Sequence, residues 1–551
     1  MKARLSSKNL FWGVLSFLPL ALYFLFLSEY AVNIPKWDDH ALKAFILDFT
    51  QADGFFAKIA TFFKQHNEHR IAFDRLITLI VYTLHGSIEY RWLMWVGNFT
   101  LIGLLILFWR LFYKNNIHFA LFVPVSCLLF QLQLWENTFW GMASMQNFGV
   151  ILFIFWTIYL ISSENPRHFY LAVFAAFMAV FTSGNGILVL PICAVLLALQ
   201  KRWQHLLIFG IISILLIFSY FYHYASPPSN PPLTGIGIKK IVLGFFLFIG
   251  SVADILPFQN LTVLLSAASG FIMFSLAAVI SVYFLLNSKL IKETRSLTQL
   301  ELFMLGTLMF LVGTALIVTV TRISFGVQGL QTSRYKIYSV LLLIIIYTAI
   351  IRKIRIEGKS LVITFLIIAG FSFNLLANYR NFSEVVNLRK QLITFPFNWA
   401  YDEKLSPSKP TIKLYETPVL FYTNQNIPGL LAASDWNSDI HKTIREDGLE
   451  LVNTNFEKPS GKDAGAYLLL ESSRRTYLVP ARQENYPVQS TLKTHSYWAK
   501  GFRVNIQKNE FDSGTYHLGL WIQKENGGEI FTLNDSLVVE TLHKKTVKTN
   551  W

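Results

Sequence analysis

Long apolar runs recur along the first 380 residues of this chain. They lie near residues 10–27, 92–112, 117–134, 146–162, 167–183, 186–200, 204–223, 262–286, 298–320, 335–352 and 359–376. Such runs approach the length at which a helix crosses a hydrocarbon core of about 30 Å. Hydrophobic residues make up 53% of the chain and charged residues only 15%, against about 25% charged in soluble proteins. We therefore predict a polytopic α-helical membrane protein with about eleven transmembrane helices.

The positive charges between these runs predict which way the chain crosses the membrane. Two further apolar runs, near 71–85 and 240–257, are interrupted or amphipathic. If neither of them crosses, every loop cluster of Lys and Arg falls on one side, which the positive-inside rule makes cytoplasmic. These clusters are Arg110/Lys114, Arg167, Lys201/Arg202, Lys289/Lys292/Arg295 and Arg352/Lys353/Arg355/Lys359. We predict a cytoplasmic N-terminus, two helices along the outer surface, and an outer C-terminal region.

The net charge of +15 is then accounted for by cytoplasmic loops, and no nucleic-acid partner is predicted. The sequence Leu-Ser-Glu-Tyr-Ala after the first run is a poor cleavage site, so this run is predicted to stay as an anchor. The two cysteines, Cys127 and Cys193, lie inside apolar runs. Neither is placed for a disulfide or a metal site.

After about Arg380 the chain becomes polar, and short segments rich in β-branched and aromatic residues alternate with Gly, Asn and Asp. These segments are Ala466–Glu471, Thr476–Val479, Gly501–Ile506, Thr515–Ile522 and Leu537–Glu540. The pattern predicts an antiparallel β-sandwich. We expect a membrane domain at 1–380 and an exported β-rich domain at 381–551. Its aromatic residues are typical of a sandwich core, although they could also stack on sugar rings; they include Tyr497, Trp498, Phe502, Tyr516 and Trp521.

The first outer loop, residues 29–91, is unusually long and begins with Asp38-Asp39-His40 after Trp37. A carboxylate at a membrane surface can act as a general base that deprotonates a hydroxyl group. An adjacent pair can also hold a divalent cation such as Mg²⁺ or Mn²⁺ against a phosphate. Alternatively, the acidic pair caps an amphipathic helix over 41–49. The loop leaves these interpretations open.

The same loop continues with His66-Asn67-Glu68-His69-Arg70. His66 and His69 are three residues apart, a spacing that can bring two ligands to one face. Asn67 could instead cap the helix that follows, with Glu68 in its first turn. Arg70 is available either for a ligand phosphate or for lipid headgroups.

Polar residues also gather in the other outer loops. Glu136 and Asn137 follow the third run, and Asn185 lies between the fifth and sixth runs. Arg322, Arg334 and Tyr335 lie between the ninth and tenth runs. Arginines on an otherwise uncharged outer face suggest an anionic ligand, and snorkelling to lipid phosphate is the alternative.

Together these features resemble the GT-C superfamily of membrane glycosyltransferases, which includes protein mannosyltransferases and aminoarabinose transferases. The resemblance covers roughly residues 1–380. It consists of the acidic pair after the first span, an acidic residue in the next outer loop, an Arg-Tyr pair before a late span, and an exported C-terminal domain. This chain has Asp-Asp where the mannosyltransferases have Asp-Glu, and its 66–70 segment lacks their usual proline.

The resemblance implies roles for these residues. Asp38 would be the general base, assisted by Asp39, which could also help to bind a cation. Glu136 would orient the acceptor or the base. Four residues would hold the donor phosphate: Arg334, Tyr335, Arg322 and Arg70. The remaining candidates would contact the acceptor or the sugar: His40, His66, Asn67, Glu68, His69, Asn137 and Asn185.

The implied activity is transfer of a sugar from a polyprenyl-phosphate donor to an envelope glycan, lipid or protein acceptor, by an inverting single displacement. Membrane lipids are the other expected partners, and a bacterial inner membrane is the expected location. Three alternatives remain. They are a transporter or flippase for polyprenyl-linked glycans, an O-antigen ligase or polymerase, and a non-catalytic assembly subunit.

Overall fold

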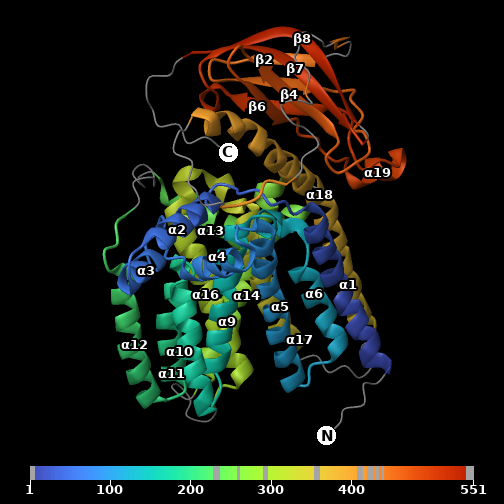
Figure 1. The fold of residues 1–551 in the computed structure, drawn as a ribbon. Helices are drawn as coiled ribbons and strands as arrows, with labels where there is room; N and C mark the ends of the chain where they lie inside the picture. Colours follow the sequence, from blue (N-terminus) through green and yellow to red (C-terminus); the bar gives the residue numbers. More distant parts are fainter. Residues whose placement is uncertain are drawn as a thin grey trace. The chain divides into compact units, whose positions relative to one another are not determined.

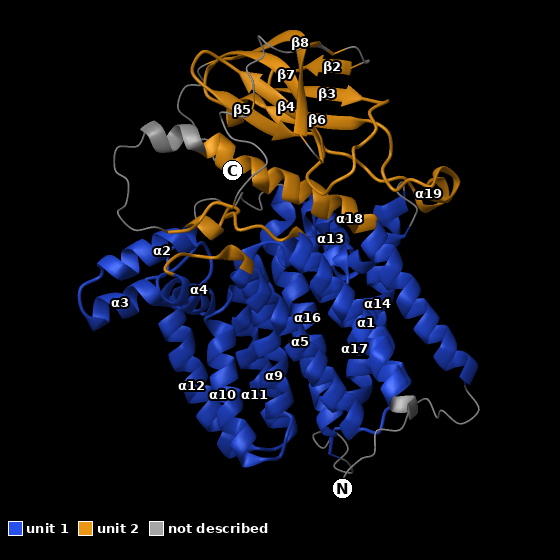
Figure 2. Ribbon diagram, turned by 45° about the vertical axis from the view of Figure 1, so that its right-hand side comes forward, with its two compact units in different colours: residues 1–29, 41–85, 92–379 blue, residues 30–40, 86–91, 380–551 orange. Residues whose placement is uncertain are grey.

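The computed structural model describes residues 7–226, 236–256, 261–288, 296–352, 360–405, 414–418, 427, 434–436, 440–525 and 527–540. The chain forms two compact units, coloured separately in Figure 2. Unit 1 comprises residues 1–29, 41–85 and 92–379, and unit 2 comprises residues 30–40, 86–91 and 380–551. Each unit is described on its own below.

Unit 1, drawn blue in Figure 2, consists of helices, which Figure 1 labels. Within the described residues, nine helices or runs of helices are long and apolar enough to cross a membrane. They are Leu10–Tyr30, Tyr90–Lys114, Phe119–Thr138, Gly141–Ile161, Trp203–Phe221, Thr262–Leu286, Gln299–Phe325, Ser333–Ile351 and Ser360–Trp399. Helices α10 (Pro166–Val180) and α11 (Val189–Leu199) are shorter and also apolar. The predicted polytopic membrane fold is confirmed, and α10 and α11 occupy the remaining two predicted runs.

The two interrupted or amphipathic runs, 71–85 and 240–257, form short helices. Residues 71–85 contain α4 (Ala72–His85), and residues 240–257 contain most of α13 (Ile238–Ile249) followed by the 3₁₀-helix η5 (Ser251–Ile255). Neither is among the nine candidate spans. In the long loop before α4, the chain forms α2 (Asp39–Gln51) and α3 (Phe55–Phe62).

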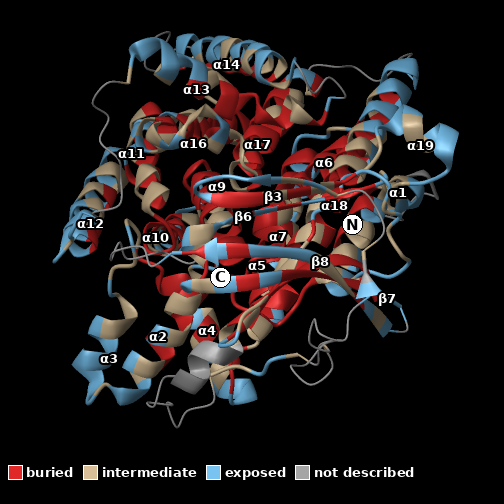
Figure 3. Cartoon of the chain, turned by 90° about the horizontal axis from the view of Figure 1, so that it is seen from above, coloured by how far each residue is buried: buried red, intermediate tan, exposed pale blue. Residues whose placement is uncertain are grey.

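Burial separates the inner helices from the outer ones (Figure 3). Helices α16 (Gln299–Arg322) and α17 (Ser333–Ile351) are mostly buried, whereas α12 (Trp203–Phe221) and α14 (Thr262–Leu286) expose most of their apolar side chains. Exposed apolar faces of this kind are what lipid contact requires. The inner helices therefore form the packed centre of unit 1.

The chain between α5 (Tyr90–Lys114) and α9 (Gly149–Ile161) is a series of short, buried helical pieces. They are η1 (Phe119–Phe122), α6 (Val123–Leu129), η2 (Leu132–Leu134), α7 (Trp135–Thr138), α8 (Gly141–Ala143) and the π-helix η3 (Ser144–Phe148). Broken backbone is tolerated in a membrane protein where other protein groups satisfy it. Asn374 donates to the carbonyls of Cys127 and Phe130, and Asn378 accepts from the Leu132 amide.

Unit 2 contains the predicted two-sheet domain. Strands β1 (Ser434–Asp435), β8 (Gly527–Val539), β7 (Gly514–Lys524), β4 (Gly465–Glu471) and β5 (Thr476–Pro480) form one sheet in that order. Strands β2 (Ile440–Ile444), β3 (Gly448–Asn453) and β6 (Phe502–Gln507) form the other. All pairings are antiparallel except that of β1 with β8. Four of the five predicted segments coincide with β4 to β7. The fifth, 537–540, overlaps only the end of β8, which begins at Gly527, and β1, β2 and β3 were not predicted.

Helix α18 (Ser360–Leu405) contributes to both units, and its last part packs on the five-stranded sheet of unit 2. The Asn398 amide exchanges two hydrogen bonds with the backbone of Leu478 on the edge strand β5, at 2.9 and 3.0 Å. Lys390 donates to the Ala466 and Ala481 carbonyls, and Phe397 packs against the apolar cluster that contains Trp521. The helix thereby covers an edge that would otherwise be open to pairing.

Candidate functional site

Asp38 and Asp39 lie in a tight turn of unit 2 at the start of α2. Trp37 adopts a left-handed φ of 44°, and the Asp39 amide donates to the Lys36 carbonyl at 2.9 Å. The Asp39 carboxylate in turn accepts the Lys36 amide at 3.0 Å and is fully buried. Asp38 is only half-buried. Asp39 therefore stabilises the turn, while Asp38 is the more accessible carboxylate.

His40, the third residue of this motif, packs its ring edge-on against Trp399 of α18, with 5.2 Å between ring centroids. Both residues belong to unit 2. The first turn of α2 thus contacts the part of α18 that belongs to unit 2.

The motif at 66–70 forms a small hairpin in unit 1. His66 and His69 exchange two backbone hydrogen bonds of 2.8 Å, and Asn67 adopts a φ of 48° at the tip. Helix α4 begins only at Ala72, so Asn67 does not cap it. The hairpin explains the three-residue spacing of the histidines by backbone pairing.

Glu68 and His69 reach two other polar segments that are distant in sequence. The Glu68 carboxylate pairs with the Arg322 guanidinium at the end of α16. His69 Nδ1 accepts the Gly184 amide at 3.0 Å, and His69 Nε2 lies 3.9 Å from the Glu68 carboxylate. Because Nδ1 accepts a hydrogen bond, the proton of a neutral His69 ring sits on Nε2, facing Glu68.

The guanidinium of Arg70 is used in hydrogen bonds within the protein. It is buried and donates to the backbone carbonyls of Phe63, Tyr220 and Tyr222. Burial lowers its pKa, and the neighbouring Tyr220 acts in the opposite direction. The nearby Arg75 donates to the Phe62 and Lys64 carbonyls, and burial lowers its pKa to about 10. Both arginines hold the backbone around α3 and α4, and a phosphate on Arg70 would have to compete with three carbonyls.

Glu136 of α7 and Arg334 of α17 come together. Arg334 Nε lies 3.5 Å from Glu136 Oε1, which is too long for a good hydrogen bond. The guanidinium lies over the rings of Trp140 and Tyr335, at 5.9 and 5.7 Å from their centroids. Within the described part of the chain its Nε is buried and makes no hydrogen bond. Arg334 is therefore a cation with unused donors.

The two predicted asparagines hold the surrounding backbone and side chains. Asn137 donates to the Arg334 carbonyl at 2.9 Å and accepts from the Asn147 amide at 2.9 Å. Asn185 donates to the Tyr338 hydroxyl at 2.9 Å. Asn137 thus joins the broken segment to α17, and Asn185 joins the loop before α11 to the same helix.

A second buried ion pair, which the sequence analysis did not single out, adjoins this site. Lys336 of α17 pairs with Asp254 of η5, and the Gln133 amide donates to the same carboxylate at 2.6 Å. The Ser333 hydroxyl donates to the Gln133 carbonyl and accepts the Glu136 amide, so the two pairs form one network. A lone Asp254 within an apolar run was the signal that could have indicated it.

The metal option depends on Asp38 and Asp39. Among the described residues, no group of three or more His, Cys, Asp or Glu side chains could hold a metal ion. Mg²⁺ is commonly held by one or two carboxylates together with substrate phosphates and water. Of the acidic pair only Asp38 is accessible, because the Asp39 carboxylate is buried and accepts the Lys36 amide.

Comparisons with protein-family models, with curated proteins and with solved structures found no match for this chain. The fold itself defines the class: a multi-span helical membrane protein with a C-terminal domain of two β-sheets.

Proposed function

We propose that this protein is an integral membrane glycosyltransferase that moves a sugar from a polyprenyl-phosphate donor to a hydroxyl of an envelope glycan, lipid or protein. The observation that carries the proposal is that the Arg334 guanidinium has hydrogen-bond donors that no described protein group accepts. A guanidinium within a buried polar network, with donors that no described protein group uses, is well suited to an anionic ligand.

The surroundings of Arg334 support a phosphate ligand. Glu136 and the rings of Trp140 and Tyr335 hold the guanidinium at the start of α17. Arg322 and Arg70 are already paired with Glu68 and with backbone carbonyls, so they contribute less to the proposal.

The resemblance assigns the general base to the acidic pair, and within the pair Asp38 has the accessible carboxylate, whereas that of Asp39 is buried and bonded to the Lys36 amide. Asp38 takes the proton of the acceptor hydroxyl while the oxygen of that hydroxyl attacks the anomeric carbon of the sugar. The bond from that carbon to the phosphate oxygen breaks on the opposite side, which inverts the configuration. The departing polyprenyl phosphate keeps the electron pair, and Arg334 stabilises its charge.

The test is mass profiling of envelope glycans and polyprenyl-linked sugars in a strain that lacks the gene. The strain is complemented with wild type, Asp38→Asn, Arg334→Lys or the control Asp48→Asn, which changes an exposed carboxylate of the same helix α2. Expression of each protein is checked in membranes.

We expect wild type and Asp48→Asn to restore a fixed sugar increment, and the other two variants to lose it at least about 100-fold. The increment then identifies the sugar, and the modified molecule identifies the acceptor. Full restoration by expressed Asp38→Asn and Arg334→Lys would contradict transfer at these residues and favour the flippase alternative.

A further inference from the structure

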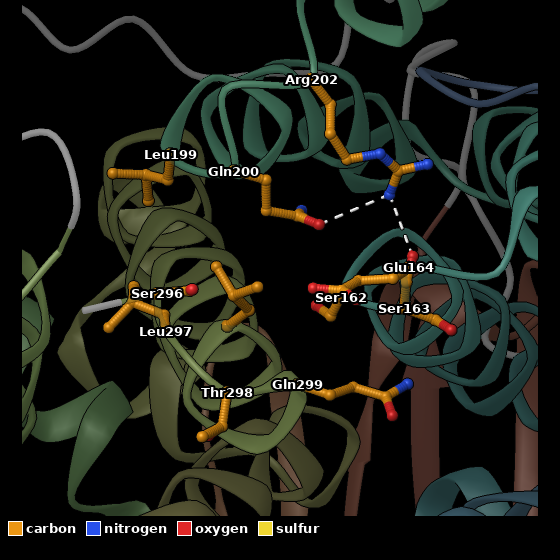
Figure 4. A pocket seen from close by; sticks show the side chains of 11 residues that line it. Ser162, Ser163, Glu164, Leu199, Gln200, Arg202, Ser296, Leu297, Thr298 and Gln299 are labelled. Carbon is orange, nitrogen blue, oxygen red and sulfur yellow. Dashed lines mark hydrogen bonds between the residues drawn. The ribbon is translucent and has the colours of Figure 1, made fainter. Parts of the chain in front are cut away.

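A second candidate site lies in unit 1, at the opposite ends of the apolar helices from the Glu136–Arg334 pair. A cavity of about 580 Å³ is lined by the residues that end α9 and α11 and by those that begin α16. Figure 4 shows its lining side chains, among them Ser163, Glu164, Gln200, Arg202 and Gln299. The site is separate from the groups assigned to glycosyl transfer.

Arg202 uses only one of its guanidinium nitrogens in hydrogen bonds with the described residues. Its Nη1 donates to the Ile161 carbonyl at 3.1 Å. It also donates to the Ser163 carbonyl at 2.9 Å and to Gln200 Oε1 at 3.4 Å (Figure 4). Within the described residues, Nε and Nη2 make no hydrogen bond. These two nitrogens form the fork that binds a phosphate in a bidentate manner.

Glu164 supplies the opposite charge in the same cavity. Its carboxylate is exposed, makes no ion pair within the described part of the chain, and interacts electrostatically with Arg202. The rest of the lining combines hydroxyl and amide groups with three leucines, Leu199, Leu297 and Leu302. A ligand that fits has a phosphate, a cationic group close to it, and an apolar part.

The position of the cavity indicates where such a ligand comes from. Exposed aromatic residues lie at the same ends of neighbouring helices: Tyr113 ends α5, Tyr170 is in the first turns of α10, and Trp203 begins α12. Tyr and Trp with exposed rings are enriched where a membrane meets water. The cavity therefore lies at the depth of lipid headgroups.

We propose that this cavity binds the headgroup of an amine-bearing phospholipid, with the phosphodiester on Arg202, the ammonium on Glu164 and the start of the acyl chains beside the leucines. Basic pockets between transmembrane helices are known to hold lipid headgroups. The single carboxylate makes the cavity selective for lipids with an amine. A lipid without an amine places its anionic phosphate near the anionic Glu164 with no cation between them.

The experiment is native mass spectrometry of the full-length protein with added phosphatidylethanolamine, phosphatidylglycerol or phosphatidylcholine. We expect phosphatidylethanolamine to bind at least about 10-fold more tightly than the other two, because its primary ammonium donates hydrogen bonds to a carboxylate. Equal binding of all three lipids overturns the proposal.

Two variants and a control assign the binding to this cavity. Glu164→Gln should abolish the preference for phosphatidylethanolamine over phosphatidylglycerol. It leaves the fold intact because the Glu164 carboxylate makes no hydrogen bond or ion pair within the described residues. Arg202→Gln should weaken phosphatidylethanolamine at least about 10-fold. Lys201→Gln, an exposed neighbour outside the cavity lining, should bind as wild type. Retention of the preference by Glu164→Gln overturns the assignment.

A competition with glycerophosphoethanolamine distinguishes the lipid from a soluble phosphate. This molecule carries the same phosphate and amine without acyl chains. We expect it not to displace the lipid at equal concentration. Displacement at equal concentration would overturn the lipid as the occupant and assign the cavity to a soluble phosphoamine.

Discussion

Arg70, Arg322 and Arg334 differ in how far the protein itself uses their guanidinium groups. Arg70 donates to three backbone carbonyls, and Arg322 pairs with Glu68. Arg334 has one loose ion pair, with Glu136, and two aromatic neighbours. An arginine whose donors are already satisfied stabilises the fold, whereas one with free donors is available to a ligand.

Arg334→Lys should impair ligand binding more than folding. The ammonium keeps a positive charge opposite Glu136 but loses the planar fork, so we expect a stability change below about 1 kcal/mol. Binding of undecaprenyl phosphate, measured by native mass spectrometry, should weaken at least about 10-fold. Wild-type affinity in Arg334→Lys would remove Arg334 from the phosphate site.

Arg70→Lys should show the reverse pattern. A lysine cannot reach the carbonyls of Phe63, Tyr220 and Tyr222 together, so two charged hydrogen bonds are lost. We expect a loss of about 2–4 kcal/mol in unfolding free energy. Hydrogen exchange should accelerate around residues 62–64 and 220–222. Unchanged exchange there would contradict the structural role.

At the scale of elements, two contacts leave little room for substitution: that of α18 with strand β5 and that of α13 with α14. The last part of α18 lies along the five-stranded sheet of unit 2 and bonds to its edge strand β5 through Asn398. Helices α13 and α14 approach so closely that a Cβ added at Gly270 would lie 1.9 Å from the Phe246 carbonyl oxygen. Small residues permit this kind of backbone contact between membrane helices.

Asn398→Ala should destabilise unit 2. The substitution removes two hydrogen bonds and leaves the buried amide and carbonyl of Leu478 without them, which costs about 2–4 kcal/mol. The matched control is Asn505→Ala, which changes an exposed asparagine on β6. Thermal unfolding of the two variants gives the comparison. Equal melting temperatures would mean that α18 does not stabilise the sheet through this side chain.

Gly270→Ala should disturb the packing of α13 on α14. The added methyl group cannot fit without a backbone shift, and we expect a loss of about 1–3 kcal/mol. Gly210→Ala on α12 is the control, because a Cβ there meets nothing within 4 Å. Stability of both variants can be followed by thermal unfolding in detergent. Similar stability of the two would argue against the close contact.

At the scale of the whole molecule, the distribution of Lys and Arg predicts the sides of the membrane. We predict that a membrane-impermeant maleimide labels Lys493→Cys of the β-sheet domain in intact cells. Lys114→Cys, in a loop predicted to be cytoplasmic, should react only after permeabilisation. Both positions are exposed, and the native Cys127 and Cys193 are buried, so background labelling should be low. The opposite labelling pattern would reverse the predicted orientation.

The membrane fold was predictable because hydrophobic length and charge are properties of local sequence. The runs at 92–112 and 335–352 are continuous, and each forms a helix at nearly those bounds. The strands β4 to β7 were likewise predictable from alternating side chains between turn residues. β2 and β3 carry weaker patterns, because much of β2 is exposed and β3 contains a glutamate.

The chain's composition and apolar periodicity were sufficient to place it among polytopic helical membrane proteins with a β-sheet domain. The loops predicted to lie outside indicated which polar residues to consider. The pairing of those residues came from the folded structure alone. Glu68 and Arg322 are 254 positions apart, and Asp254 and Lys336 are 82 apart. Contacts over such separations depend on how helices pack, which no local pattern encodes. That packing satisfies Arg70 within the protein and leaves donors of Arg334 free for a ligand.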